Sequence, residues 1–189
     1  LDLRWGINEE TARSGKVVEI CMDEIVRSRP FFIGLIGGRY GWIPQEGDEA
    51  ITEKLLIKYP WIKDCVKDGL SITEMEMQFG VLNNPEPINA YFFQKDEIAI
   101  PGKFREKRGS EHAQKLSRLK SAVKEAADAG KCTLGSYSTM KALGRQVHDA
   151  LMAAIEQLYP EEQNSRYAVY SRNQHEFLEA RRDVYVRYE

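Results

Sequence analysis

The feature that most constrains the fold is the run Phe31–Ile36, which follows Pro30 and leads into Gly37-Gly38. Six residues without a polar side chain have the length of a strand. A continuous rather than alternating pattern is typical of a strand covered on both faces. Strands of this kind belong to parallel sheets, because parallel crossovers place helices over the sheet. The run therefore predicts a central strand of an α/β domain.

The rest of the chain alternates between strand and helix patterns. Further strands are expected at 88–93 and 131–137, and Leu1–Arg4 resembles the end of another strand. Strands separated by helices imply right-handed βαβ units and a parallel sheet. Residues 43–70 are expected to form a helical insertion over the sheet edge. Helices are predicted at 16–28, 49–59, 61–67, 71–82, 111–129 and 139–159.

Composition excludes several classes of protein. The 27 basic and 29 acidic residues nearly balance, so no global field indicates nucleic acid or an anionic membrane as partner. No apolar run is long enough to span a bilayer. Three scattered cysteines and three histidines lack the spacing of a metal site, and unpaired thiols favour a reducing, cytoplasmic setting. The chain does not begin with Met, so we expect a fragment of a larger protein.

Two segments form a candidate site. The helix that starts at Ser71 carries Glu74 at the third position of a capping box, and Glu76 follows it. The glycine-rich loop 37–42 follows the strand Phe31–Ile36. Ligands of open α/β sheets bind outside the carboxyl ends of the strands, so a loop of this kind beside a helix-borne carboxylate is a plausible site.

Several motifs resemble a known family. They are Leu1-Asp-Leu-Arg-Trp-Gly6, the segment Cys21–Trp42 and Thr73-Glu-Met-Glu76. Over roughly residues 1–160 they look like an uncharacterised TIR-like domain that precedes NACHT-type, STAND-class NTPase modules and tetratricopeptide or WD repeats. Members include telomerase-associated and nephrocystin-like proteins. The resemblance implies a flavodoxin/TIR-like three-layer fold whose first strand is missing from this chain, and a linker and helical tail at 161–189 that leads toward the NTPase.

The family is in turn similar to TIR domains and nucleoside deoxyribosyltransferases, which share its architecture. Their catalytic Glu follows a helix start, and both comparisons favour Glu76 as the catalytic residue, with Glu74 second. The Trp and Cys of the TIR signature are absent here. A carboxylate beside a ribose can stabilise the oxocarbenium-like transition state of N-glycosidic cleavage. The resemblance thus implies NAD or another nucleotide as a possible substrate, with no certain cofactor.

The remaining residues of such a nucleotide pocket can be named. The glycine N–H groups of the loop suit a diphosphate, the arginines can pair with it, and the aromatic rings can stack on a base. The candidate nucleotide-binding residues are Arg4, Trp5, Gly37, Gly38, Arg39, Tyr40, Trp42 and Thr73.

Each of these residues also has a structural interpretation. Glu74 serves equally as a helix cap, and Glu76 as a solvated side chain. The glycine pair suits a tight exit from the strand, and Trp5 and Trp42 suit lids of the core. Arg4 can pair with Asp2, Glu9 or Glu10.

Two functions follow from these alternatives. The first is a regulatory domain of a multidomain STAND-type protein, which mediates self-association or docking, including docking to the NTPase and repeat modules of the same chain. The second is a nucleotide-processing effector that cleaves NAD or a nucleoside through Glu76. Enzymatic activity, the substrate, the partner and the oligomeric state are not determined by the sequence.

Overall fold

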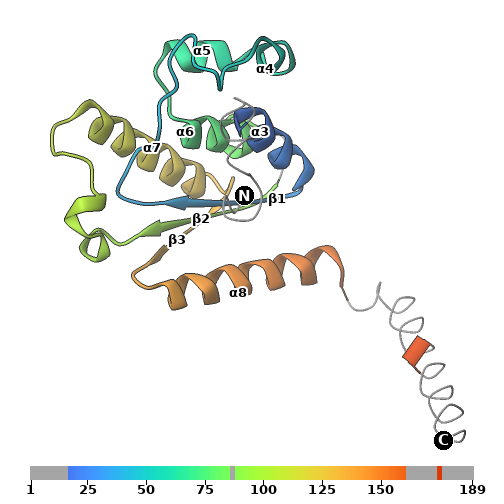
Figure 1. Cartoon of the computed structure of the whole chain (residues 1–189). Coiled ribbons are helices and arrows are strands. Elements are labelled where there is room, and N and C mark those ends of the chain that lie inside the picture. The colour runs from blue at the N-terminus through green and yellow to red at the C-terminus, as the bar shows by residue number, and fades with distance from the viewer. Residues whose placement is uncertain (1–16, 86–87, 161–173, 176–189) are drawn as a thin grey trace, which may run out of the picture. The chain divides into compact units, whose positions relative to one another are not determined.

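Three parallel strands form the sheet of this protein, as a computed structural model shows (Figure 1). The structure describes residues 17–85, 88–160 and 174–175. The chain divides into two units, residues 1–144 and 145–189, and each is described by itself. Leu1–Arg4 and the tail beyond residue 160, apart from residues 174–175, lie outside the described residues, and the predicted boundary at residue 160 stays a prediction.

The strands follow the order β1 (Phe31–Ile36), β2 (Asn89–Lys95) and β3 (Thr133–Tyr137). Phe31 lies opposite Asn89 in the first pair, and Tyr91 lies opposite Thr133 in the second. The prediction of a parallel α/β sheet is confirmed, and the strand Phe31–Ile36 has the bounds that its apolar run indicated. Three parallel strands flanked by helices are consistent with a flavodoxin-like fold.

Helices α6 (Ile72–Met77) and α7 (Glu111–Asp128) cover one face of the sheet. Alternate residues of β1 and β2 point to this face, as the period of a strand requires. The buried cluster there contains Ile36, Ala90 and Phe92 from the strands and Met77, Val81, Leu116, Leu119 and Val123 from the helices.

The opposite face of β1 corrects one expectation. Ile33 and Leu35 are 38% and 50% exposed, so the described residues do not cover this strand fully on both faces. β1 is the edge strand of the described sheet, with β2 on one side. An apolar run indicates that a strand belongs to a core, but it does not indicate which elements supply the cover.

A second core is formed by helices that pack on α6. It joins α3 (Val17–Arg27), α4 (Glu53–Lys58) and α5 (Ile62–Lys67) through buried apolar side chains. Met22 and Leu55 lie at its centre, and Met75 reaches it from α6. Helices α4 and α5 of the segment 43–70 thus pack on α3 and α6, while Ile43 packs against the cluster on the sheet.

The remaining elements agree with the sequence, with one exception. Helix α7 begins after its cap Ser110 and ends before Gly130, whose φ is +74°. The helix expected over 71–82 divides into α6 and a π-helical turn, η1 (Gln78–Leu82). Two short turns, η2 (Glu97–Ala99) and η3 (Gly102–Phe104), lie in the loop after β2, and α8 (Met140–Leu158) follows β3. No helix in the described part of the chain is long and apolar enough to cross a bilayer.

Candidate functional site

The N-terminus of α6 is capped through Ser71 and Tyr40. The Ser71 Oγ accepts a hydrogen bond from the backbone N–H of Glu74 at 3.2 Å. The backbone N–H of Ser71 donates to the hydroxyl of Tyr40 at 3.3 Å, and this hydroxyl donates to the Glu74 carboxylate. In a standard capping box the Glu carboxylate would reach the cap N–H directly. Here the Tyr40 hydroxyl stands between them.

This arrangement gives Glu74 a structural role. Its second carboxylate oxygen accepts from Gln78 Nε2 at 3.0 Å. Tyr40 is only 1% exposed, and burial together with the Glu74 carboxylate raises the pKa of its phenol. Tyr40 is therefore part of the core and of the helix cap, and its ring is not available to stack on a base.

The glycine loop is closed by the segment that follows β2. The backbone N–H of Tyr40 donates to Glu106 Oε1 at 2.9 Å. The N–H of Glu106 in turn donates to the carbonyl of Gly38 at 2.9 Å, and Arg39 donates to the carbonyl of Lys103 at 2.7 Å. One backbone donor and one cation that would suit a diphosphate are thus bound to the protein's own chain.

Two glycines of the loop are required by close approach. A Cβ on Gly38 would lie 2.6 Å from the carbonyl oxygen of Phe104, a backbone atom that cannot move aside cheaply. Gly41 has a φ of +104°, and a Cβ there would lie 3.2 Å from the Oγ1 of Thr73. Thr73 thus lies against the loop. Trp42 is 53% exposed and forms no lid over the core.

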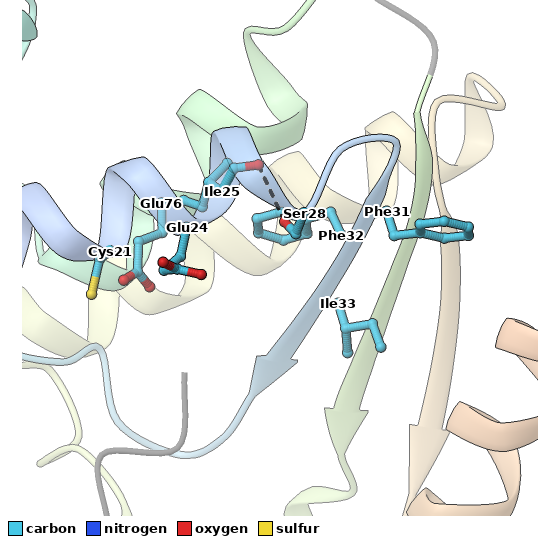
Figure 2. Close-up of a pocket in the computed structure, with 8 residues that line it drawn as sticks. All are labelled: Cys21, Glu24, Ile25, Ser28, Phe31, Phe32, Ile33 and Glu76. Atoms are coloured by element: carbon cyan, nitrogen blue, oxygen red, sulfur yellow. Dashed lines mark hydrogen bonds between the residues drawn. The ribbon is translucent and has the colours of Figure 1, made fainter. Parts of the chain in front are cut away.

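Glu76 lies in a different place from Glu74. Two residues further along α6, it turns toward α3 and lines a pocket of about 400 Å³ (Figure 2). Figure 2 shows Glu76 beside Cys21 and Glu24, with Phe32 on the α3 side of β1 and Phe31 and Ile33 on the other side. The pocket is lined by Cys21, Glu24, Ile25, Ser28, Phe31, Phe32, Ile33 and Glu76.

Burial controls the electrostatics of this pocket. It raises the pKa of Glu76, while a hydrogen bond from the Cys21 thiol opposes the shift. Burial and the neighbouring Glu76 carboxylate raise the pKa of Cys21 to about 12, so the thiol stays protonated and is no nucleophile at neutral pH. A half-buried carboxylic acid with a raised pKa has the properties of a general acid or base.

The structure therefore separates residues that the sequence placed in one site. Glu74, Thr73 and the loop 37–42 lie together, whereas the pocket of Glu76 contains no residue of this loop. Gly37 borders open space. Arg4 and Trp5 lie outside the described residues. In the part of the chain that the structure describes, no group of His, Cys, Asp and Glu side chains is arranged to hold a metal ion.

Sequence analysis missed the roles of Glu106 and Cys21. Glu106 lies in a stretch that reads only as a polar loop, and no local pattern links it to a backbone amide 66 residues away. Cys21 shares a helix stripe with Ile25, a pattern that predicts a buried apolar side chain and no partner for it.

The parallel sheet, the flanking helices and the loops after β1 and β2 define the class as an α/β domain of flavodoxin-like architecture. The chain belongs to the family described as "Domain of unknown function (DUF4062)", whose model matches residues 2–152.

Known relatives are much longer proteins. The chain is 32% identical to mouse "Telomerase protein component 1" over 150 residues, which are 73% of this chain and 5% of that protein. It is 31% identical to human "NACHT domain- and WD repeat-containing protein 1" over 53% of this chain and 6% of the relative. A TPR repeat-containing protein of Dictyostelium discoideum is 30% identical over 51% of this chain and 6% of its own length. The chain thus spans about a twentieth of these relatives. No solved structure matches it.

Proposed function

We propose that this domain is a regulatory docking module of a multidomain protein, which acts by self-association or by binding other modules and not by cleaving nucleotides. The observation that carries the proposal is the closure of the glycine loop by the segment 103–106. Two groups that would suit a diphosphate, the N–H of Tyr40 and the guanidinium of Arg39, are already bound within the chain, and a ligand would have to displace these contacts.

The known relatives support this role. Their names include NACHT, WD-repeat and TPR-repeat proteins, in which this domain is a small part of the length. We propose that the docking partners include the NTPase and repeat modules of the same polypeptide. A regulatory module requires surface complementarity only, and exposed apolar side chains such as Ile98 and Ile57 provide surface for it.

A second function is favoured by one observation. The half-buried Glu76 has a raised pKa and lines a pocket of about 400 Å³, large enough for part of a nucleotide. This geometry supports the proposal that Glu76 is the catalytic residue of an NAD or nucleoside N-glycosidase. The TIR-like character that would accompany this activity stays a prediction.

One assay separates the two functions. The 189-residue chain is incubated with NAD, and release of nicotinamide is followed by chromatography. Glu76→Gln is the test variant, and Glu24→Gln is the matched control, because it removes a carboxylate from the same pocket. If the domain is a docking module, neither the wild type nor either variant releases nicotinamide. Turnover by the wild type that Glu76→Gln abolishes and Glu24→Gln retains would establish the enzyme and reject the docking proposal.

Closure of the glycine loop can be tested in the same protein. If Glu106 blocks an anion site, Glu106→Ala exposes the N–H of Tyr40, and binding of ADP-ribose should appear by calorimetry in the variant alone. Absence of binding in both proteins supports a purely structural role for the loop.

A further inference from the structure

The loop between β2 and α7 carries an exposed basic surface. This loop, residues 96–110, contains four basic and three acidic side chains, and its four basic side chains are clustered within residues 103–108. The basic surface is defined by the exposed cations Lys103, Arg105, Lys107 and Arg108 with the apolar side chains Ile98 and Phe104.

Arg105 stabilises the conformation of the loop that carries this surface. Its Nε donates to the carbonyl of Ile100 at 2.9 Å, and its guanidinium also reaches the carbonyl of Glu97. The two turns η2 and η3 are thus fastened together. They present Ile98, which is 99% exposed, and Phe104, which is 51% exposed.

Within the described part of the chain, the cations of the basic surface form no salt bridge, although Glu97 and Glu106 line the same pocket as Arg105 and Arg108. Among the described residues, none of its four cations has a carboxylate within 4.0 Å. Arg105 binds backbone carbonyls, and Lys103 Nζ lies 5.0 Å from the centre of the Phe104 ring. The surface is therefore available to an acidic partner.

An acidic surface lies on another part of the same domain. Residues 40–53 contain four acidic side chains and no basic ones. The acidic surface is defined by the exposed residues Glu46, Glu49 and Glu53 with Ile57, which is 81% exposed. Glu53 and Ile57 are one turn apart on α4 and share a face of this helix.

The lysines of α4 do not neutralise this surface. Lys54 pairs with Glu19 at 2.9 Å, and Lys58 pairs with Asp23 at 2.6 Å, both on α3. Within the described ranges, Glu46, Glu49 and Glu53 have no cation within 4.0 Å. Each surface thus combines exposed side chains that are mostly of one charge sign, and that form no salt bridge among the described residues, with exposed apolar side chains.

We propose that the acidic surface of one copy of this chain binds the basic surface of a second copy. The inference rests on the proposed docking function and names its surfaces. The two surfaces are on different elements, α4 and the β2–α7 loop, which lie well apart in Figure 1. When two copies make this contact only once, the contact is head-to-tail, and it generates a ring or an open chain of subunits.

A second copy of this chain fits these observations better than nucleic acid or an anionic membrane does. Ile57 can pack against Ile98 or Phe104, and the carboxylates can pair with the surrounding cations. Nucleic acid would use the cations but leave the aliphatic Ile98 exposed, and an anionic membrane would leave the acidic surface without a partner.

The first experiment measures association of the 189-residue chain by sedimentation velocity at up to about 0.5 mM, because small charged interfaces are weak. We expect the mean sedimentation coefficient to increase with protein concentration. This increase should become smaller as the salt concentration rises from about 0.05 to 0.5 M. The control variant Lys63→Gln/Lys67→Gln removes two exposed cations from α5 and should associate like the wild type.

Two blocked variants then test the surfaces separately. The triple variant Phe104→Ser/Lys107→Gln/Arg108→Gln removes three of the six side chains that define the basic surface, and its self-association should weaken about tenfold or more. Circular dichroism and thermal melting of this variant test whether it remains folded.

The complementary triple variant is Glu49→Gln/Glu53→Gln/Ile57→Ser, which removes three of the four side chains that define the acidic surface and should weaken self-association to the same extent. Each triple variant keeps the surface that the other lacks. When the two triple variants are mixed, they should form a 1:1 complex that does not bind further copies.

The outcomes are distinct. A 1:1 pair from two non-associating variants supports the inference. A chain that stays monomeric throughout, or triple variants that associate like the wild type, overturn it. In the latter case docking through another surface remains, so the proposed function survives. Binding of the basic surface to anionic vesicles or RNA in the absence of self-association also overturns the inference and assigns that surface to another partner.

Discussion

The hydroxyl of Tyr40 joins two groups that a capping box normally brings together directly. It accepts from the N–H of Ser71 at 3.3 Å and donates to the carboxylate of Glu74. The cap of α6 thus depends on a side chain 31 residues upstream of Ser71, in the loop that leaves the sheet.

Tyr40→Phe removes this hydroxyl and nothing else. It leaves the N–H of Ser71 and one carboxylate oxygen of Glu74 without this partner in a buried setting, so we expect a loss of about 1–3 kcal/mol of unfolding free energy. Urea denaturation measures the loss. Tyr91→Phe is the control, since no hydrogen bond of its hydroxyl is found among the described residues, and it should change stability by less than about 0.5 kcal/mol. Equal effects of the two substitutions would contradict the role of Tyr40 in the cap.

Gly38→Ala should be destabilising although it adds a single methyl group. The new Cβ would lie 2.6 Å from the carbonyl oxygen of Phe104 and 2.8 Å from Ile100 Cγ2, and overpacking of this kind costs about 1–3 kcal/mol. Gly37→Ala meets no atom within 4 Å and is the matched control. It should be neutral or stabilise the chain by up to about 1 kcal/mol. Thermal melting of the pair tests whether the β2–α7 loop closes on Gly38.

Glu76 should make stability depend on pH. Burial raises its pKa in the folded state above the ordinary 4.5, so the folded state binds more protons between the two values. Stability therefore falls as pH rises through this window and stays lowered above it. Glu76→Gln cannot ionise. Its unfolding free energy should exceed that of the wild type at pH 7, and the difference should vanish below about pH 4, where the carboxyl is protonated in both states. A difference that does not change with pH would show that Glu76 is not desolvated.

Asp23 should act in the opposite direction. Hydrogen bonds from Lys58 and Tyr59 lower the pKa of its carboxyl below the ordinary 3.8. The stability this gives is present above that value and is lost as pH falls through the folded pKa. Asp23→Asn should cost about 1 kcal/mol at neutral pH, because the pair is partly exposed. Acid titration of both proteins in urea should show their unfolding free energies converging at low pH, and a constant gap would reject the linkage.

The elements of the fold could be predicted because their causes are local. The apolar run of β1 forms the strand itself, and the stop at Gly130 lies directly after the helix that it ends. The π-helical turn was not predicted, because one widened turn leaves the apolar pattern of residues 71–82 nearly unchanged.

The candidate site was predicted only in part, because its contacts join distant residues. The hydroxyl of Tyr40 meets Glu74 across 34 residues, and its N–H meets Glu106 across 66. Spacing within a helix places Glu74 and Glu76 on different sides, yet it does not reveal that one side meets Tyr40 and the other Cys21. Docking against neighbouring elements decides these roles.

Tyr40 is held at both ends, with its N–H on Glu106 and its hydroxyl on the cap of α6. The loop after β1, the loop after β2 and the first turn of α6 therefore share one anchor. Opening any one of them breaks contacts of the others, so their amide protons should exchange with solvent as a single cooperative unit. A partner that binds one of these segments would change the hydrogen-exchange rates of all three segments.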